Sequence, residues 1–99
     1  MNGGYFMIKK DRILAEFFEL VQITCNSRQE REIGDLMKKR LQDLGGEVIE
    51  DGAGAIIGGN CGNIIANFKG TLSDKPTIML AAHLDCVVPC VGVKPILKD

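Results

Sequence analysis

The sequence predicts an α/β fold in which helices pack on a mixed sheet. In the first half of the chain, two segments between residues 11 and 44 carry apolar residues at helical spacing. Three short strand-like runs follow, and the last is apolar on both faces, as is typical of a strand covered on both sides. The chain has 99 residues, which is at most one domain, and residues 1–99 contain no domain boundary. Residues 91–97 begin another extended run without a closing element, so we expect an incomplete domain.

The first helix is expected to begin near Asp11, whose carboxylate either caps the helix or favours its positive N-terminal end. The second helix is predicted from the capping-box pattern between Ser27 and Glu30, and it ends before the Gly45-Gly46 pair. The apolar face of each helix repeats at helical spacing: Ile13, Leu14, Phe17, Phe18 and Val21 in the first, and Ile33, Leu36, Met37, Leu41 and Leu44 in the second. The charged residues of the second helix, among them Lys38, Lys39, Arg40 and Asp43, are predicted to form a solvated face without a function.

Three strands are predicted after the helices, at Glu47–Glu50, Asn63–Phe68 and Thr77–Ala82. Glu47–Glu50 alternates and suits an edge position, whereas Thr77–Ala82 is expected in the centre of the sheet. Residues 70–76 form a turn by their Gly, Ser, Asp and Pro content. The glycine cluster at 52–59 lacks the spacing of a dinucleotide fingerprint and the Gly-Lys-Ser/Thr ending of a phosphate loop. We expect it to be a connecting loop.

His83 and Asp85 are the residues most indicative of chemistry, because they lie at the end of the most apolar run in the chain. His83 is the only histidine, and α/β folds place their functional groups beyond the carboxyl ends of strands. Residues two apart on a strand project to the same face. A metal-binding histidine is usually oriented by a carboxylate on its second ring nitrogen. The alternatives are a hydrogen-bonded structural histidine and a turn carboxylate.

The segment Ala82-His83-Leu84-Asp85-Cys86-Val87-Val88-Pro89 resembles the first metal motif, H-x-D-x-V-x-P, of the co-catalytic zinc peptidases. That clan includes carboxypeptidase G2 and the aminoacylases. The resemblance to peptidase-T-like tripeptidases extends upstream and covers roughly residues 9 to 99. It is carried by four further segments: Leu20–Ile23, Glu30–Ile33, Leu41–Gly45 and Gly58–Ala66.

The resemblance implies that the chain is the N-terminal portion of a zinc-peptidase catalytic domain. His83 matches the ligand of one of two zinc ions, and Asp85 matches the catalytic-site carboxylate that orients this histidine. The implied activity is aminopeptidase cleavage of short peptides, favouring tripeptides. The same motif also occurs in acyl-amino-acid deacylases and carboxypeptidases of the clan. The other ligands and the general base of the family have no match here, so we expect the chain alone to be inactive.

Composition and charge exclude several other classes of function. The net charge is −1 and no basic block is present, so nothing indicates nucleic-acid binding. No apolar run approaches the roughly 20 residues that cross a bilayer, so no membrane partner is expected. The N-terminal residues lack the apolar core of a secretory signal, which predicts a cytoplasmic protein. In that compartment we expect the four cysteines to be reduced.

Two stand-alone alternatives remain. In the first, His83, Cys86, Cys90 and Cys61 form a closed zinc site, although Cys61 has no paired ligand near it in the sequence. In the second, the chain is a small interaction domain that forms a homo-oligomer through exposed strand edges. A defined dimer in solution would favour the interaction domain over a truncated enzyme.

Overall fold

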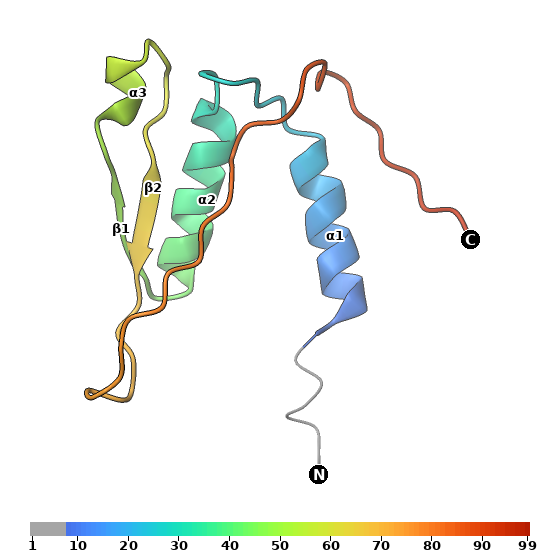
Figure 1. The fold of residues 1–99 in the computed structure, drawn as a ribbon. Coiled ribbons are helices and arrows are strands. Elements are labelled where there is room, and N and C mark those ends of the chain that lie inside the picture. The colour runs from blue at the N-terminus through green and yellow to red at the C-terminus, as the bar shows by residue number, and fades with distance from the viewer. Residues whose placement is uncertain (1–7) are drawn as a thin grey trace.

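The computed structural model describes residues 8–99. Along the chain these residues form α1 (Lys10–Val21), α2 (Arg31–Asp43), β1 (Glu47–Glu50), α3 (Ala53–Ile56) and β2 (Ile64–Asn67) (Figure 1). Both predicted helices and the first two predicted strands are confirmed. The prediction that no export signal is present concerns mainly residues 1–7, which lie outside the described residues.

β1 and β2 form an antiparallel pair in which Val48 lies opposite Ala66 and Ile49 opposite Ile65. Burial alternates along both strands, as the two-residue period of a strand requires. The more buried face carries Val48 and Glu50 and lies against α2, which runs beside both strands (Figure 1). Ile49 and Ile65 project from the opposite face and are 58% and 40% exposed. The predicted α/β class, with helices packed on a sheet, is therefore confirmed.

The prediction of a central strand at Thr77–Ala82 is wrong for the described residues. This segment is extended but belongs to no sheet, and it runs along α2 toward the N-terminal end of that helix (Figure 1). Ile78, Met79 and Leu80 are between 83% and 93% exposed. A strand exists only where a neighbouring backbone completes its ladder of hydrogen bonds. The apolar pattern was compatible with a buried strand, but within residues 8–99 the only sheet is the β1–β2 pair.

The glycine cluster is also more ordered than a loop. Residues 53–56 form the short helix α3. Just after this helix, the backbone amide of Gly59 donates to the carbonyl of Gly54 at 2.7 Å. Gly58 has a φ of 74°, which a glycine adopts at little cost. This turn leads the chain toward β2.

The charged face of α2 makes ion pairs with neighbouring elements. Arg40 pairs with Glu16, at 2.9 Å, and with Glu19, and these contacts join α2 to α1. Lys38 pairs with Glu50 of β1 at 2.9 Å. The expectation of a purely solvated face is therefore wrong for two of its four residues, because long basic side chains reach across to carboxylates on neighbouring elements.

The molecule is a thin layer with extents of 45 × 42 × 19 Å. The buried apolar side chains in the described part of the chain are Cys25, Ile33, Cys61 and Cys90. α1 contributes no buried residue. No helix among residues 8–99 combines the length and apolar composition of a bilayer-crossing segment. Three of these four buried residues are cysteines, and two of them, Cys25 and Cys90, belong to the candidate site described below.

Candidate functional site

His83 and Asp85 lie side by side at the end of the extended segment. The Nδ1 atom of His83 is 3.4 Å from Oδ1 of Asp85, longer than the roughly 2.7–3.2 Å of a well-formed N–H···O bond. The imidazole is 94% exposed, whereas the Asp85 side chain is only 31% exposed. The carboxylate is therefore anchored in the protein, and the ring projects from it into solvent.

Ser27 anchors the Asp85 carboxylate. Its hydroxyl donates a hydrogen bond of 2.5 Å to Oδ2 of Asp85, on the side away from His83. This bond is the main reason why the pKa of Asp85 lies below its usual value, and the nearby His83 adds to the effect. Asp85 is thus held as a carboxylate, the form that accepts a hydrogen bond from a histidine ring.

The role of Ser27 differs from the capping role predicted from sequence. α2 begins at Arg31 with Glu30 at the N-cap position, and no side chain of that residue caps the helix. The amide of Arg31 instead donates to Oδ1 of Asn60 at 3.1 Å. Because Asn60 supplies the cap from a distant loop, the Ser27 hydroxyl is available to Asp85.

A short parallel contact brings the two segments of the site together. Asn26 and Cys86 form an isolated parallel bridge, and the amide of Cys86 donates to the carbonyl of Cys25 at 2.9 Å. The thiol of Cys90 adds a second link by donating to Oδ1 of Asn26 at 2.8 Å. These contacts fix the segment after His83 against the loop between α1 and α2.

The site borders an open hollow of about 510 Å³. The residues that line it are Asn26, Ser27, His83, Asp85, Cys86, Val87 and Val88. The hollow therefore combines a histidine, a carboxylate, a hydroxyl and a thiol with the apolar side chains of Val87 and Val88, which suits the binding of a small ligand with a polar reacting group.

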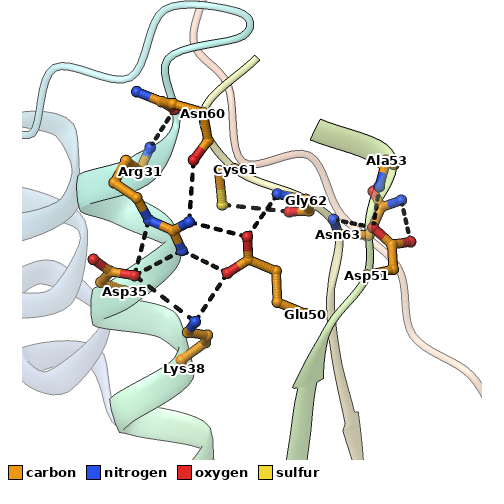
Figure 2. A network of polar contacts seen from close by, with 10 residues as sticks. All are labelled: Arg31, Asp35, Lys38, Glu50, Asp51, Ala53, Asn60, Cys61, Gly62 and Asn63. Atoms are coloured by element: carbon orange, nitrogen blue, oxygen red, sulfur yellow. Dashed lines mark hydrogen bonds and ion pairs between the residues drawn. The ribbon is translucent and has the colours of Figure 1, made fainter. Parts of the chain in front are cut away.

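A network of polar contacts joins α2 to β1 and to the segment that leads into β2 (Figure 2). Arg31 of α2 makes two bonds to the Glu50 carboxylate, at 3.0 and 2.5 Å, and a bond of 3.0 Å to Asp35. Glu50 also accepts bonds from Lys38 and from the amide of Gly62, both at 2.9 Å. The pKa of Glu50 is held well below its usual range by these bonds: the largest contribution comes from Arg31, followed by the Gly62 amide and Lys38.

Asn60 connects this network to the site. The Arg31 side chain donates to the backbone carbonyl of Asn60 at 3.0 Å (Figure 2). The backbone amide of Asn60 in turn donates to the backbone carbonyl of Arg28 at 3.0 Å. Arg28 has a φ of 71°, a left-handed conformation that costs a non-glycine residue about 1–2 kcal/mol. The bond from Asn60 helps to hold this turn, which lies next to Ser27 in the chain.

A second polar cluster closes the end of the β1–β2 pair. Asp51 accepts bonds from the side chain of Asn63 at 2.8 Å, from the Asn63 amide at 2.8 Å and from the Ala53 amide at 3.0 Å. These bonds, the Asn63 side chain first, lower the pKa of Asp51. They fix the start of α3 relative to β2 (Figure 2).

The cysteines do not assemble into the closed zinc site considered above. Among residues 8–99, no three His, Cys, Asp or Glu side chains are arranged to hold a metal ion. Cys61 lies against Gly34 of α2, and its thiol contacts the carbonyl of Gly62 at 3.3 Å. Cys61 therefore belongs to the packing between α2 and the glycine-rich segment.

Comparisons with known proteins place this arrangement in context. The crystal structure of aminopeptidase PepT from Bacillus cereus ATCC 10987 matches the chain with a TM-score of 0.89 and 41% sequence identity. The chain is similar to one quarter of an aminopeptidase. The match covers 94% of the chain and 25% of the aminopeptidase.

A curated sequence gives the same proportions. The uncharacterized protein YqjE of Bacillus subtilis (strain 168) is 42% identical over 93 residues, which are 94% of this chain and 25% of YqjE. No family model matches the sequence. The chain thus spans about a quarter of the length of the relatives it matches, and it has the fold of part of an aminopeptidase domain.

The sequence indicated His83 and Asp85 as candidate site residues, and the structure places them side by side, but it did not indicate the contacts of Ser27 and Asn60. Ser27 was assigned to a capping box because its spacing to Glu30 fits that motif. Asn60 sits in a glycine-rich stretch, where an asparagine is normally a turn residue. No local signal distinguishes these roles, because both depend on contacts between segments more than 25 residues apart in the chain.

Proposed function

We propose that this chain is the N-terminal part of a zinc-dependent aminopeptidase that removes the N-terminal residue of short peptides, tripeptides above all. The observation that carries the proposal is the contact between His83 and Asp85, in a chain that is similar to a quarter of aminopeptidase PepT. The peptidase activity belongs to the longer protein.

His83 fits the role of a metal ligand. Its Nδ1 faces Asp85, which leaves the Nε2 lone pair for a metal when the proton is on Nδ1. The ring is almost fully exposed beside a hollow, so a ligand can approach it. Zinc takes imidazole nitrogen readily, and the nearby carboxylate strengthens the ligand.

Asp85 acts as a positioning residue, and Ser27 positions Asp85 in turn. One carboxylate oxygen faces the ring, while the other accepts the hydroxyl proton of Ser27. This division keeps the carboxylate from rotating away from the imidazole. The Asn26–Cys86 bridge holds the backbone of both segments in register.

The remaining requirements lie outside this chain. A catalytic zinc site has about three protein ligands and one open position, and we propose that residues outside residues 1–99 supply the rest. When bound, two zinc ions would polarise the peptide carbonyl and lower the pKa of a bridging water. We further propose a cytoplasmic location, in which the four cysteines would stay reduced.

The test uses the native protein that contains this chain, recovered from its cells with an antibody raised against residues 8–99. We expect a band several times heavier than the 10.8 kDa of the chain. The purified protein should release the N-terminal residue of an unmodified tripeptide, lose this activity in a chelator and regain it with zinc. A heavy protein that leaves the tripeptide intact in the presence of zinc would refute the proposal.

Two controls separate the alternatives within the clan. The N-acetylated form of the same tripeptide should be a poor substrate, whereas a deacylase would prefer it. The identity of the released residue distinguishes cleavage at the N-terminus from carboxypeptidase cleavage. A His83→Ala variant of the native protein should be inactive at every zinc concentration that supports the parent, because it lacks one ligand.

The 99-residue chain alone should bind zinc weakly and leave tripeptides uncleaved. This expectation follows from the single histidine and from the ligand number that catalytic zinc requires. Tripeptide cleavage by this chain that disappears in His83→Ala would overturn it.

A further inference from the structure

Cys25 and Cys86 form a pair of thiols in direct contact beside the candidate site. Their Sγ atoms are 3.1 Å apart, although the residues are 61 positions apart in the sequence. All four cysteines of the described chain are free thiols. We infer that Cys25 and Cys86 are a thiol–disulfide site that a low-molecular-weight disulfide converts reversibly to an internal disulfide bond.

The backbone geometry suits such a bond. The amide of Cys86 donates to the carbonyl of Cys25, so the two backbones run side by side as in a parallel ladder. Cys86 is bridged to Asn26, so Cys25 lies one residue out of register with it. A spacing of about 4.8 Å between neighbouring strands and a rise of about 3.3 Å per residue together place the two Cα atoms about 6 Å apart, which is within the roughly 4.4–6.8 Å that separates the Cα atoms of bridged cysteines. The bond therefore requires side-chain rotation and little movement of the backbone.

The two thiols differ in access, and this difference sets the order of reaction. Cys86 lines the open hollow, whereas Cys25 is 2% exposed. Burial, together with the contact to Cys86, raises the pKa of Cys25 to about 12, so Cys25 stays protonated at neutral pH. An external disulfide therefore meets Cys86 first, and Cys25 resolves the product.

The exchange balances in two steps. The Cys86 thiolate attacks one sulfur of the external disulfide, the external S–S bond breaks, and one external thiol leaves with a proton from solvent. Cys25 then gives its proton to solvent and its sulfur attacks the Cys86 sulfur; the bond between Cys86 and the external sulfur breaks, and the second external thiolate leaves and takes up a proton from solvent. Two protein thiols are oxidised by two electrons, and one external disulfide is reduced to two thiols.

Cys90 is the competing partner, and the structure disfavours it. Its position four residues after Cys86 makes it the natural partner in an unfolded chain. Loop-closure statistics favour this short loop over the 61-residue one by roughly 60-fold. In the folded chain, however, the Cys90 thiol is buried and donates to Asn26. Folding should therefore reverse the preference from Cys90 to Cys25.

The bond would act on the candidate site through its neighbours. Cys25 lies two residues before Ser27, and Cys86 directly follows Asp85. Oxidation would join covalently the two segments that the Ser27–Asp85 bond joins in the reduced chain. This inference rests on the thiol contact alone and holds whether or not the longer protein is a peptidase.

The test incubates the reduced 99-residue chain with oxidised glutathione in native buffer, and in parallel in concentrated urea. Free thiols are then blocked with N-ethylmaleimide, and the chain is digested and mapped by mass without reductant. In native buffer we expect a cross-link between the Cys25 and Cys86 peptides that dithiothreitol reverses, with Cys61 still blocked by maleimide. In urea the Cys86–Cys90 loop should dominate.

Matched serine variants assign the sulfur atoms. Cys86→Ser should abolish the cross-link to the Cys25 peptide, and Cys90→Ser should leave it intact. The inference is refuted if the Cys86–Cys90 loop dominates in native buffer, if native and urea products are the same, or if Cys86 remains joined to glutathione. Absence of any reaction in native buffer would also refute it.

Discussion

Gly54 is the position where a small substitution gives the sharpest test of the packing described above. It is buried in α3, against the backbone of the segment that leads into β2. A Cβ atom at this position would lie 2.5 Å from the carbonyl carbon of Cys61 and 2.9 Å from the amide nitrogen of Gly62. Carbon atoms normally pack at about 3.5–4.0 Å, so Gly54→Ala forces one of two backbones to move.

The size of the effect follows from two opposing contributions to the free energy of unfolding. Alanine in place of glycine favours a helix by about 1 kcal/mol. Overpacking costs typically about 1–3 kcal/mol, and the upper end applies because the obstacle is backbone rather than a flexible side chain. The net loss is about 2 kcal/mol, which for a chain of this size lowers the Tm by roughly 8–16 °C.

Gly52→Ala is the matched control. Gly52 immediately precedes α3, has a φ of −88°, and has no atom within 4 Å of a Cβ built on it. Alanine at this position restricts the unfolded chain and should stabilise the protein by up to about 1 kcal/mol. Thermal unfolding followed by far-UV circular dichroism compares the two variants with the parent. A Gly54→Ala chain that is as stable as Gly52→Ala would refute the packing argument.

Three further predictions concern contacts between elements. Because Arg31 and Lys38 of α2 lower the pKa of Glu50, the folded chain gains stability from this carboxylate above the unfolded value near 4.5 and loses it as the pH falls toward the lower folded value. Glu50→Gln should therefore flatten the dependence of Tm on pH in acid, measured beside Glu47→Gln, which removes a carboxylate of the same strand outside this network. Arg40→Gln removes the ion pairs that join α2 to α1, so amide hydrogen exchange should become faster in α1 but not in β1. The control is Lys39→Gln, which removes an ion pair within α2 and should leave exchange in α1 unchanged. In the longer native protein, Asp85→Ala should weaken zinc binding by about 10–100-fold, and Ser27→Ala should weaken it less, because the carboxylate remains; equal loss in both would contradict the division of roles.

The helices and the first two strands were predictable because their signals are local. Apolar spacing within α2 and the following Gly45-Gly46 pair place that helix without reference to the rest of the chain. The alternation in β1 likewise indicates its half-buried state. Each of these patterns repeats over one element, and the matching packing partner lies within a few tens of residues.

The absence of the third strand and the contact of Ser27 with Asp85 were not predictable from the sequence. Thr77–Ala82 has the composition of a central strand, but composition does not specify which backbone pairs with it, and within residues 8–99 none does. Ser27 has the spacing of a cap, but Asn60 takes that role from the glycine-rich segment. The resemblance to a peptidase motif identified His83 and Asp85, while the hydroxyl that holds Asp85 follows only from the fold.

The single parallel bridge between Asn26 and Cys86 has a consequence for how the molecule assembles. The contacts among α2, β1 and β2 join neighbours along the chain and can form early in folding, since local contacts close short loops. The bridge closes a far longer loop for one rung of backbone hydrogen bonding, and closure entropy rises with loop length. The histidine and its carboxylate are therefore expected to come beside Ser27 late in folding, after α2, β1 and β2 have packed together.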